Sequence, residues 1–214
     1  MGARMEMGSA GDQALLAEAL AGNHDALADL FWHFRDRLLA MVRLRLDRRV
    51  ASRIDPADVL QETFLEVQRR FPDYAADPAR MPFFLWLHTL AGQHLLQLHR
   101  KHLGAQCRDA SLEISIHGGA TLAASSVGLA AELAASITSP SQAAMREERR
   151  ERFQAALNAL APMDLEILAL RHFEEFTNDE VAERLGLTKA AASNRYVRAL
   201  RRLKEQLGSR EALP

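Results

Sequence analysis

Apolar residues recur along most of this chain at spacings of three and four, which is the period of one helix face. The pattern predicts a short helix over 12–20, a longer one over 24–49 capped by Asn23, and further helices over 55–71 and 82–102. No stretch shows the strict alternation that a half-buried strand requires. We therefore expect an all-α fold.

The segment 177–207 carries the most specific local signals. Thr177 is followed three residues later by Glu180, which is the arrangement of a capping box. Gly186 can adopt the left-handed turn that ends a short helix, and Thr188 can cap the next one. Two helices joined by a short turn containing glycine form a helix-turn-helix.

The second helix of this pair has a predicted outer face rich in basic and amide side chains. Such side chains bond base edges and phosphates. A basic helix alone is most often a solvated face, but the preceding capped helix and glycine turn favour DNA binding. The candidate contacts are Thr188, Lys189, Ser193, Asn194, Arg195 and Arg198, and the expected buried stripe is Ala192, Tyr196, Ala199, Leu200 and Leu203.

The helix over 55–71 opens with an aspartate cap and a proline, and Asp58, Gln61, Glu62 and Glu66 project from its outer sides. Paired carboxylates can support acid–base or metal chemistry, but no His or Cys accompanies them at ligand spacing. A docking face for another protein, or plain solvent exposure, is the favoured interpretation.

A loop with three prolines is expected between residues 72 and 82, before the helix over 82–102. Trp86 lies on that helix with amide and basic residues, a combination that suits single-stranded nucleic acid. Trp86 taken alone is more readily explained as a core residue. Most polar residues of the helix, including His88 and His99, are expected outside the core. The arginines at 43–53 fit either a helix dipole or nucleic-acid contact equally well.

The composition of the chain excludes several classes of function. The chain has 214 residues, is 48% hydrophobic and 26% charged, and carries a net charge of −1, so any basic surface is local. Its single cysteine, Cys107, excludes an intramolecular disulfide and a cysteine-based zinc site. The sequence shows no signal-peptide core, membrane-length apolar run or P-loop, so we expect a cytoplasmic protein without membrane insertion, cofactor or metal. Residues 107–139 are rich in Ala, Ser and Gly and are expected to be a linker.

Two parts of the chain, one in its middle and one near its end, resemble a known family. The segments DVLQETFLEV from Asp58 and FLWLHTLAGQHLLQLHR from Phe84, followed by LAPMDLEILALRHFEEF from Leu160 and the helix-turn-helix, resemble the helical domains of bacterial extracytoplasmic-function (ECF) sigma factors. The resemblance implies a region 2-like domain over 12–106, a linker over 107–139 and a region 4-like domain over 140–207. It implies a non-enzymatic factor that directs promoter-specific initiation.

The resemblance also assigns roles to matching residues. It implies that Asp58, Gln61 and Glu62 dock on the β′ coiled coil of core RNA polymerase, and that the last two helices read the promoter −35 element. Partners would then be the polymerase, through its β′ and β subunits, promoter DNA, and an anti-sigma factor of the kind common among relatives. The implied −10 contacts are Tyr74, Arg80, Trp86, Gln93, Gln97, Arg100 and Lys101.

The chain departs from the family pattern at several of these positions. Gln93 and Gln97 stand where Asn and Asp are common, which makes the −10 contacts less certain. Residues 190–192 are alanines where larger side chains are often present. Fewer side chains therefore reach bases, and −35 specificity is expected to depend on Ser193, Asn194, Arg195 and DNA shape.

Two alternatives stay open at this point. A one-component helix-turn-helix regulator would bind duplex DNA without polymerase, with residues 12–106 as a sensor or dimerisation domain. A metal-dependent enzyme would use histidines, but no carboxylate accompanies them and Arg100 and Lys101 interrupt the run, so this alternative is weak. The histidines concerned are His88, His94, His99 and His102.

Overall fold

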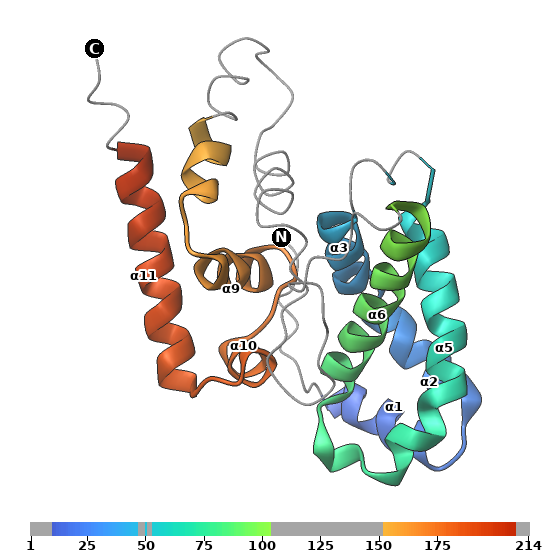
Figure 1. Cartoon of the computed structure of the whole chain (residues 1–214). Helices are drawn as coiled ribbons and strands as arrows, with labels where there is room; N and C mark the ends of the chain where they lie inside the picture. Colours follow the sequence, from blue (N-terminus) through green and yellow to red (C-terminus); the bar gives the residue numbers. More distant parts are fainter. Residues whose placement is uncertain (1–9, 47–49, 51–52, 104–151, 209–214) are drawn as a thin grey trace.

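The computed structural model describes residues 10–46, 50, 53–103 and 152–208, and every regular element among them is a helix. Figure 1 shows two groups of helices side by side, one from each half of the chain. The all-α prediction is confirmed. The predicted linker over 107–139, Cys107 and the predicted restart of helix at 140 lie outside the described residues.

The amino-terminal unit contains α1 (Ala10–Leu20), α2 (His24–His33), α3 (Arg35–Arg45), α5 (Pro56–Ala76), the short 3-10 helix η1 (Pro78–Arg80) and α6 (Phe83–Leu103). Asn23 caps α2 as predicted, because its side-chain oxygen accepts hydrogen bonds from the backbone N–H groups of Asp25 and Ala26. Helices α3, α5 and α6 pack against one another and bury the predicted apolar stripes.

The prediction of one helix over 24–49 is wrong, because the helix breaks at Phe34. The backbone N–H of Phe34 donates to the carbonyl of Phe31, three residues back at 3.1 Å, so the turn tightens before α3 begins. The Phe34 ring then lies 5.2 Å from the ring of Phe84 and 6.4 Å from that of Phe83. Aromatic packing on α6 therefore accompanies the break.

Helix α5 starts at the predicted cap, where Asp55 accepts a hydrogen bond from the backbone N–H of Ala57 at 2.8 Å. It ends later than predicted, because it continues through Pro72 to Ala76. Pro72 supplies no N–H to the carbonyl of Gln68 in the preceding turn, and both residues are exposed. The expected loop shrinks to residues 77–82, and Tyr74 lies in the helix.

The carboxyl-terminal unit contains helical residues 152–158, α9 (Pro162–His172), α10 (Asn178–Leu185) and α11 (Lys189–Gly208). Both hydrogen bonds of the Thr177–Glu180 capping box are present, and Gly186 takes the left-handed conformation with φ 63°. The helix-turn-helix is confirmed. Within the predicted stripe of α11, Ala192 and Ala199 are fully buried, whereas Leu200 is 38% exposed and does not join the core.

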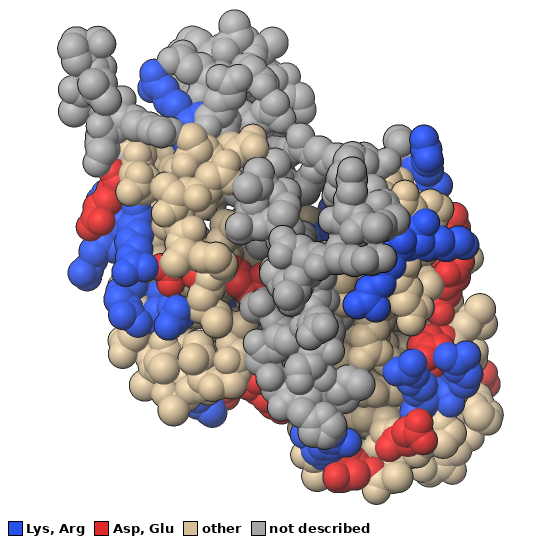
Figure 2. All heavy atoms as spheres, in the orientation of Figure 1, with Lys and Arg blue, Asp and Glu red and all other residues tan. Residues whose placement is uncertain are grey.

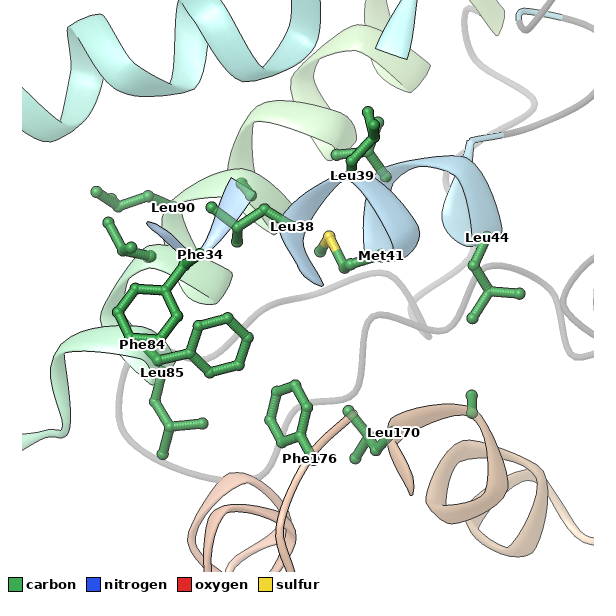
Figure 3. Packing of buried hydrophobic residues seen from close by; sticks show 14 of the residues in the cluster. Phe34, Leu38, Leu39, Met41, Leu44, Phe84, Leu85, Leu90, Leu170 and Phe176 are labelled. Carbon is green, nitrogen blue, oxygen red and sulfur yellow. The ribbon is translucent and has the colours of Figure 1, made fainter. Parts of the chain in front are cut away.

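One hydrophobic cluster runs through both units. Figure 3 shows Phe34 and Phe84 of the first unit facing Phe176 and Leu170 of the second. His88 and His99, which were expected on outer faces of α6, are 0% and 7% exposed. For His88 the expectation is wrong because the turn before α10 packs on that face of α6, which leaves α6 with more than one buried side.

Candidate nucleic-acid interface

Helix α11 presents most of the candidate −35 side chains to solvent. They lie in the amino-terminal half of the helix, directly after the Gly186 turn, where a recognition helix makes its base contacts. The opposite side of α11 packs on α9 and α10, so the candidates project away from the rest of the unit. The exposed members are Thr188, Lys189, Ser193, Asn194 and Arg198.

Arg195 is more restrained than its neighbours. Its side chain is 33% exposed, and its Nη1 lies 3.8 Å from Oδ1 of Asp164, whose own side chain is only 3% exposed. The other carboxylate oxygen of Asp164 pairs with Arg202, so one buried carboxylate on α9 contacts two arginines of α11. A side chain ordered in advance loses less conformational entropy when it binds.

Positive charge is concentrated along α11. Figure 2 shows Lys and Arg atoms gathered over this helix, on the left of the view. Lys189 is partly balanced by Asp179, whose carboxylate lies 2.7 Å from its Nζ. Because the whole chain carries a net charge of −1, any attraction to phosphates depends on this local surface. The cations that extend it are Arg198, Arg201, Arg202 and Lys204, all exposed.

Trp86 belongs to an aromatic cluster and also reaches the surface. Its ring centroid lies 4.8 Å from that of Tyr74, 5.6 Å from that of Phe83 and 6.3 Å from that of Phe71. The side chain nevertheless stays partly exposed. Trp86 therefore packs on the core while leaving part of its ring available, a geometry compatible with both interpretations of this residue.

Tyr74 is buried beneath the loop over 77–82. Its hydroxyl donates a hydrogen bond to the carbonyl of Met81 at 3.2 Å, and burial raises its pKa to about 12. The phenol therefore fixes the loop to α5. Arg80 lies in η1 on the same loop and is exposed.

The remaining −10 candidates lie on α6. Gln93 is half-buried, and its Oε1 accepts a hydrogen bond from Nη1 of Arg70 at 3.1 Å. Gln97, Arg100 and Lys101 are exposed toward the end of the helix. Gln97, Arg100 and Lys101 are therefore accessible, whereas the side-chain amide of Gln93 is hydrogen-bonded to α5.

The three candidate polymerase contacts share one exposed stripe of α5. Asp58, Gln61 and Glu62 are separated by three and four residues, and Leu65 continues the stripe one turn later. Leu65 is 65% exposed, which places a large apolar group beside the two carboxylates. The Glu62 carboxylate also lies 2.9 Å from Nε2 of His94 on α6.

A buried group of charged side chains joins the two units, and sequence reasoning did not anticipate it. The Arg45 guanidinium of α3 donates to Glu166 of α9 at 2.6 Å and to Glu174 at 2.8 Å. Nε2 of His88 on α6 lies 2.6 Å from the second oxygen of Glu174. Their exposed fractions are between 0% and 4%. We call these four residues the Arg45 cluster.

A second arginine of α3 extends the contact toward the helix-turn-helix. Arg37 donates to the backbone carbonyls of Glu174 and Glu175, at 3.4 and 3.1 Å, and to the Glu180 carboxylate at 3.3 Å. Its guanidinium also lies 3.6 Å from the centroid of the Phe84 ring. The Phe84 ring in turn packs edge-on against Phe176, with 5.2 Å between centroids.

The protonation states of the Arg45 cluster follow from burial and pairing. Burial lowers the pKa of His88 to about 4, although the Glu174 carboxylate opposes that shift. Burial alone would raise the pKa of Glu174, but attraction to Arg45 and the hydrogen bond with His88 outweigh it and lower the pKa. At neutral pH a neutral His88 therefore donates from Nε2 to a charged Glu174, which also accepts from the charged Arg45.

These residues were missed because the sequence carries only a weak signal for them. Glu166 interrupts an otherwise apolar run of α9, which in retrospect indicates a buried carboxylate with a partner. Arg45 was grouped with the arginines at 43–53, for which helix-dipole and nucleic-acid roles were weighed. The structure assigns Arg45 to neither, because its charge is buried against Glu166 and Glu174.

The histidines of the weak metal alternative have other partners. His88 lies in the Arg45 cluster and His94 is next to Glu62. Among the residues that the structure describes, no group of three or more His, Cys, Asp or Glu side chains is arranged to hold a metal ion. In the same part of the chain, no helix is long and apolar enough to cross a membrane.

Comparisons with known proteins agree with this architecture. The family "Sigma-70, region 4" matches residues 150–203. The ECF RNA polymerase sigma factor SigD of Mycobacterium tuberculosis is 28% identical over 194 residues, which are 91% of this chain and 82% of that protein. The RNA polymerase sigma-E factor of Streptomyces avermitilis is 38% identical over 55 residues, covering 26% of this chain and 31% of that protein.

A solved structure supports the fold. The structure of CnrH in complex with the cytosolic domain of CnrY matches with a TM-score of 0.54 at 22% identity, and covers 93% of this chain and 98% of that one. The match to the sigma-70 region 4 family includes the helix-turn-helix, and the match to SigD extends over both helical units. Together the comparisons support an extracytoplasmic-function sigma factor, a protein that directs transcription by RNA polymerase.

Proposed function

We propose that the amino-terminal unit docks on core RNA polymerase and captures the −10 element, while α11 reads the −35 element in the major groove. The observation that supports this proposal is that each unit carries one exposed surface suited to a different partner. One is the acidic and apolar stripe of α5, and the other is the basic face of α11 after the Gly186 turn.

The α5 stripe is the polymerase-docking surface in this proposal. Asp58 and Glu62 supply charge that steers a basic partner, while Leu65 supplies apolar area for a stable contact. A sensor domain in a one-component regulator would not need this combination, so that alternative is not favoured. The partner would be the β′ subunit, by likeness to the family.

Trp86 and the exposed end of α6 are the proposed −10 surface. Melting a duplex exposes unstacked bases, and an aromatic ring with nearby cations stabilises them by stacking and phosphate contact. Trp86 supplies the ring, and Arg100 and Lys101 supply the cations. The loop over 77–82, with Arg80 at its tip and Tyr74 beneath it, would border the captured base.

The −35 surface would combine phosphate contacts with a small number of base contacts. Ser193, Asn194 and Arg195 are the side chains long or polar enough to read bases, because residues 190–192 are alanines. An anti-sigma factor is a further proposed partner, supported by the likeness to CnrH, which is solved in complex with the cytosolic domain of CnrY.

In vitro transcription tests the proposal. The purified chain is mixed with bacterial core RNA polymerase and a genomic template library, and transcript 5′ ends are sequenced. We expect discrete start sites that share two upstream elements. Specific duplex binding by the chain alone, with no complex with core enzyme, would instead support the one-component regulator.

A further inference from the structure

We propose that Val197 on α11 is a specificity-determining residue, which contacts the C5-methyl group of a thymine in the major groove of the −35 element. This inference rests on the proposed function, because it names a base that the recognition helix selects. Val197 is apolar and 49% exposed, and it lies next to the exposed side chain of Arg198. Sequence reasoning assigned it no role.

The position of Val197 on the helix sets it apart from an incidental surface residue. Ala190, Asn194 and Val197 are separated by four and three residues, so they share one face of α11, and all three are exposed. At about 100° per residue, Val197 lies about 140° around the helix from Ala192 and about 160° from Ala199, which are both fully buried. Val197 therefore lies at the centre of the outward face and not at the edge of the core.

The side chains around Val197 allow the helix to approach the bases closely. Ala190, Ser193 and Asn194 are all short, so the first two turns of α11 carry no long side chain at the centre of the face. From residue 190 to residue 197 the helix rises by about 10 Å, at about 1.5 Å per residue. The major groove is about 12 Å wide, so it can contain both ends of this stretch.

The chemistry of valine favours thymine over the other bases. Thymine presents a C5-methyl group in the major groove, and apolar side chains contact that group. Valine offers no hydrogen bond, so it would remove water from a polar base edge without replacing the lost bond. Val197 therefore favours a methyl group as its neighbour and disfavours an exposed donor or acceptor.

Asn194 indicates where this thymine should lie. An asparagine side chain can bond the N6 and N7 positions of adenine with two hydrogen bonds. Asn194 and Val197 are three residues apart, about 4.5 Å along the helix axis, and base pairs are stacked about 3.4 Å apart. We therefore expect the thymine within one or two base pairs of an adenine that Asn194 contacts.

A second exposed apolar residue of α11 provides a matched control. Single apolar residues on a surface are common and need no function. Leu200 is 38% exposed, but it lies about 60° around the helix from Val197 and one turn farther from the Gly186 turn. It is therefore on the flank of the face, where contact with a base edge is not expected.

Uracil interference tests the contact, because uracil pairs with adenine as thymine does but lacks the C5-methyl group. A promoter fragment identified by start-site mapping is prepared with sparse uracil in place of thymine on either strand. It is bound by the full chain with core polymerase, and uracils in the bound and free fractions are mapped by cleavage with uracil-DNA glycosylase and alkali. We expect uracil at one thymine of the −35 element to weaken binding about fourfold, which corresponds to about 0.8 kcal/mol for one buried methyl group.

The same measurement on Val197→Ala removes the other side of the contact. This variant should bind thymine DNA about fourfold more weakly than the parent, and uracil at the same position should have no further effect. Alanine favours a helix more than valine does, so the fold should be kept, and circular dichroism checks this. Leu200→Ala should give the interference pattern of the parent.

Three results would overturn the role of Val197 while leaving −35 reading intact. The −35 region is protected from nuclease, but no thymine in it is sensitive to uracil; or Val197→Ala keeps the full sensitivity of the parent; or Val197→Ala weakens binding to core polymerase without DNA, which would make Val197 a protein contact. Failure of the proposed function gives a different result. If the complex protects no region near −35, the proposed reading by α11 fails, and the contact of Val197 fails with it.

Discussion

Lowering the pH from 7 to 5 should weaken the contact between the two units through His88. Burial holds its pKa near 4 while the units are packed together, against about 6.5 for a solvated histidine. A group whose pKa is lowered by folding contributes stability that is complete above the solvated pKa and is lost as pH falls toward the lowered one. The window for His88 is therefore between about pH 6.5 and 4.

The size of the effect follows from linkage. A molecule whose two units are apart binds nearly one more proton within this window, so the contact between the units weakens by up to about 1.4 kcal/mol per pH unit. Integrated from pH 7 to pH 5, the loss is about 2 kcal/mol, if separation of the units returns His88 to water. The charged groups that face His88 are Glu174, Arg45 and Arg184, and only Glu174 among them titrates near this range. The pKa of Glu174 is also lowered, so its protonation weakens the same contact as pH falls, mainly below pH 4.5.

The assay is Förster transfer between dyes on cysteines that replace the exposed residues Asp29 and Gln206, in the Cys107→Ser background. It is followed as a function of pH in the parent and in His88→Gln. Glutamine can still donate to Glu174 but does not titrate, so the difference between the two curves isolates His88 from His172, whose pKa is also lowered by burial. We expect energy transfer to fall more in the parent than in His88→Gln as pH falls to 5. Superimposable curves from pH 7 to pH 5 would refute the assigned role of His88.

Three further predictions follow from the described contacts. Arg195→Ala should weaken binding to −35 duplex by about 1–3 kcal/mol in a fluorescence titration, and an affinity unchanged within error would remove Arg195 from the reading face. Reversing charge at Asp58 and Glu62 together should reduce co-purification with core polymerase while leaving thermal unfolding unchanged; full retention would count against the α5 stripe. Glu175 has φ 55°, a strained value for a residue with a side chain, so Glu175→Gly should keep or raise the melting temperature, whereas a clear drop would show that its carboxylate outweighs the strain.

Local signals in the sequence predicted the helix ends well. Asn23, Asp55, the Thr177–Glu180 capping box and Gly186 each act within a few residues of themselves, so their structural effect can be derived without knowing the fold. The break at Phe34 was not predictable in this way, because a continuous apolar stripe runs across it. Its ring packs on α6, more than forty residues away in sequence.

The contact between the units could not be predicted from sequence periodicity, for a related reason. Periodicity identifies the face of a helix that packs within its own unit, so His88 and Arg45 were taken as outward polar positions. Their partners Glu166 and Glu174 lie in the other unit, and charge pairing across such a distance leaves no pattern in a single sequence. Asp164 pairs with Arg195 and Arg202 inside the carboxyl-terminal unit, and it was missed because these partners lie on another helix, more than thirty residues away in sequence.

Site-directed cleavage of promoter DNA tests the central claim most directly, that two units of one chain read two separated elements. An iron chelate that generates hydroxyl radicals is attached to a cysteine replacing Ala190 on α11 or His102 on α6, both exposed, in the Cys107→Ser background. In complexes with core polymerase we predict cuts near −35 from the first position and near −10 from the second. Cuts from both positions within about one helical turn of each other would contradict the account.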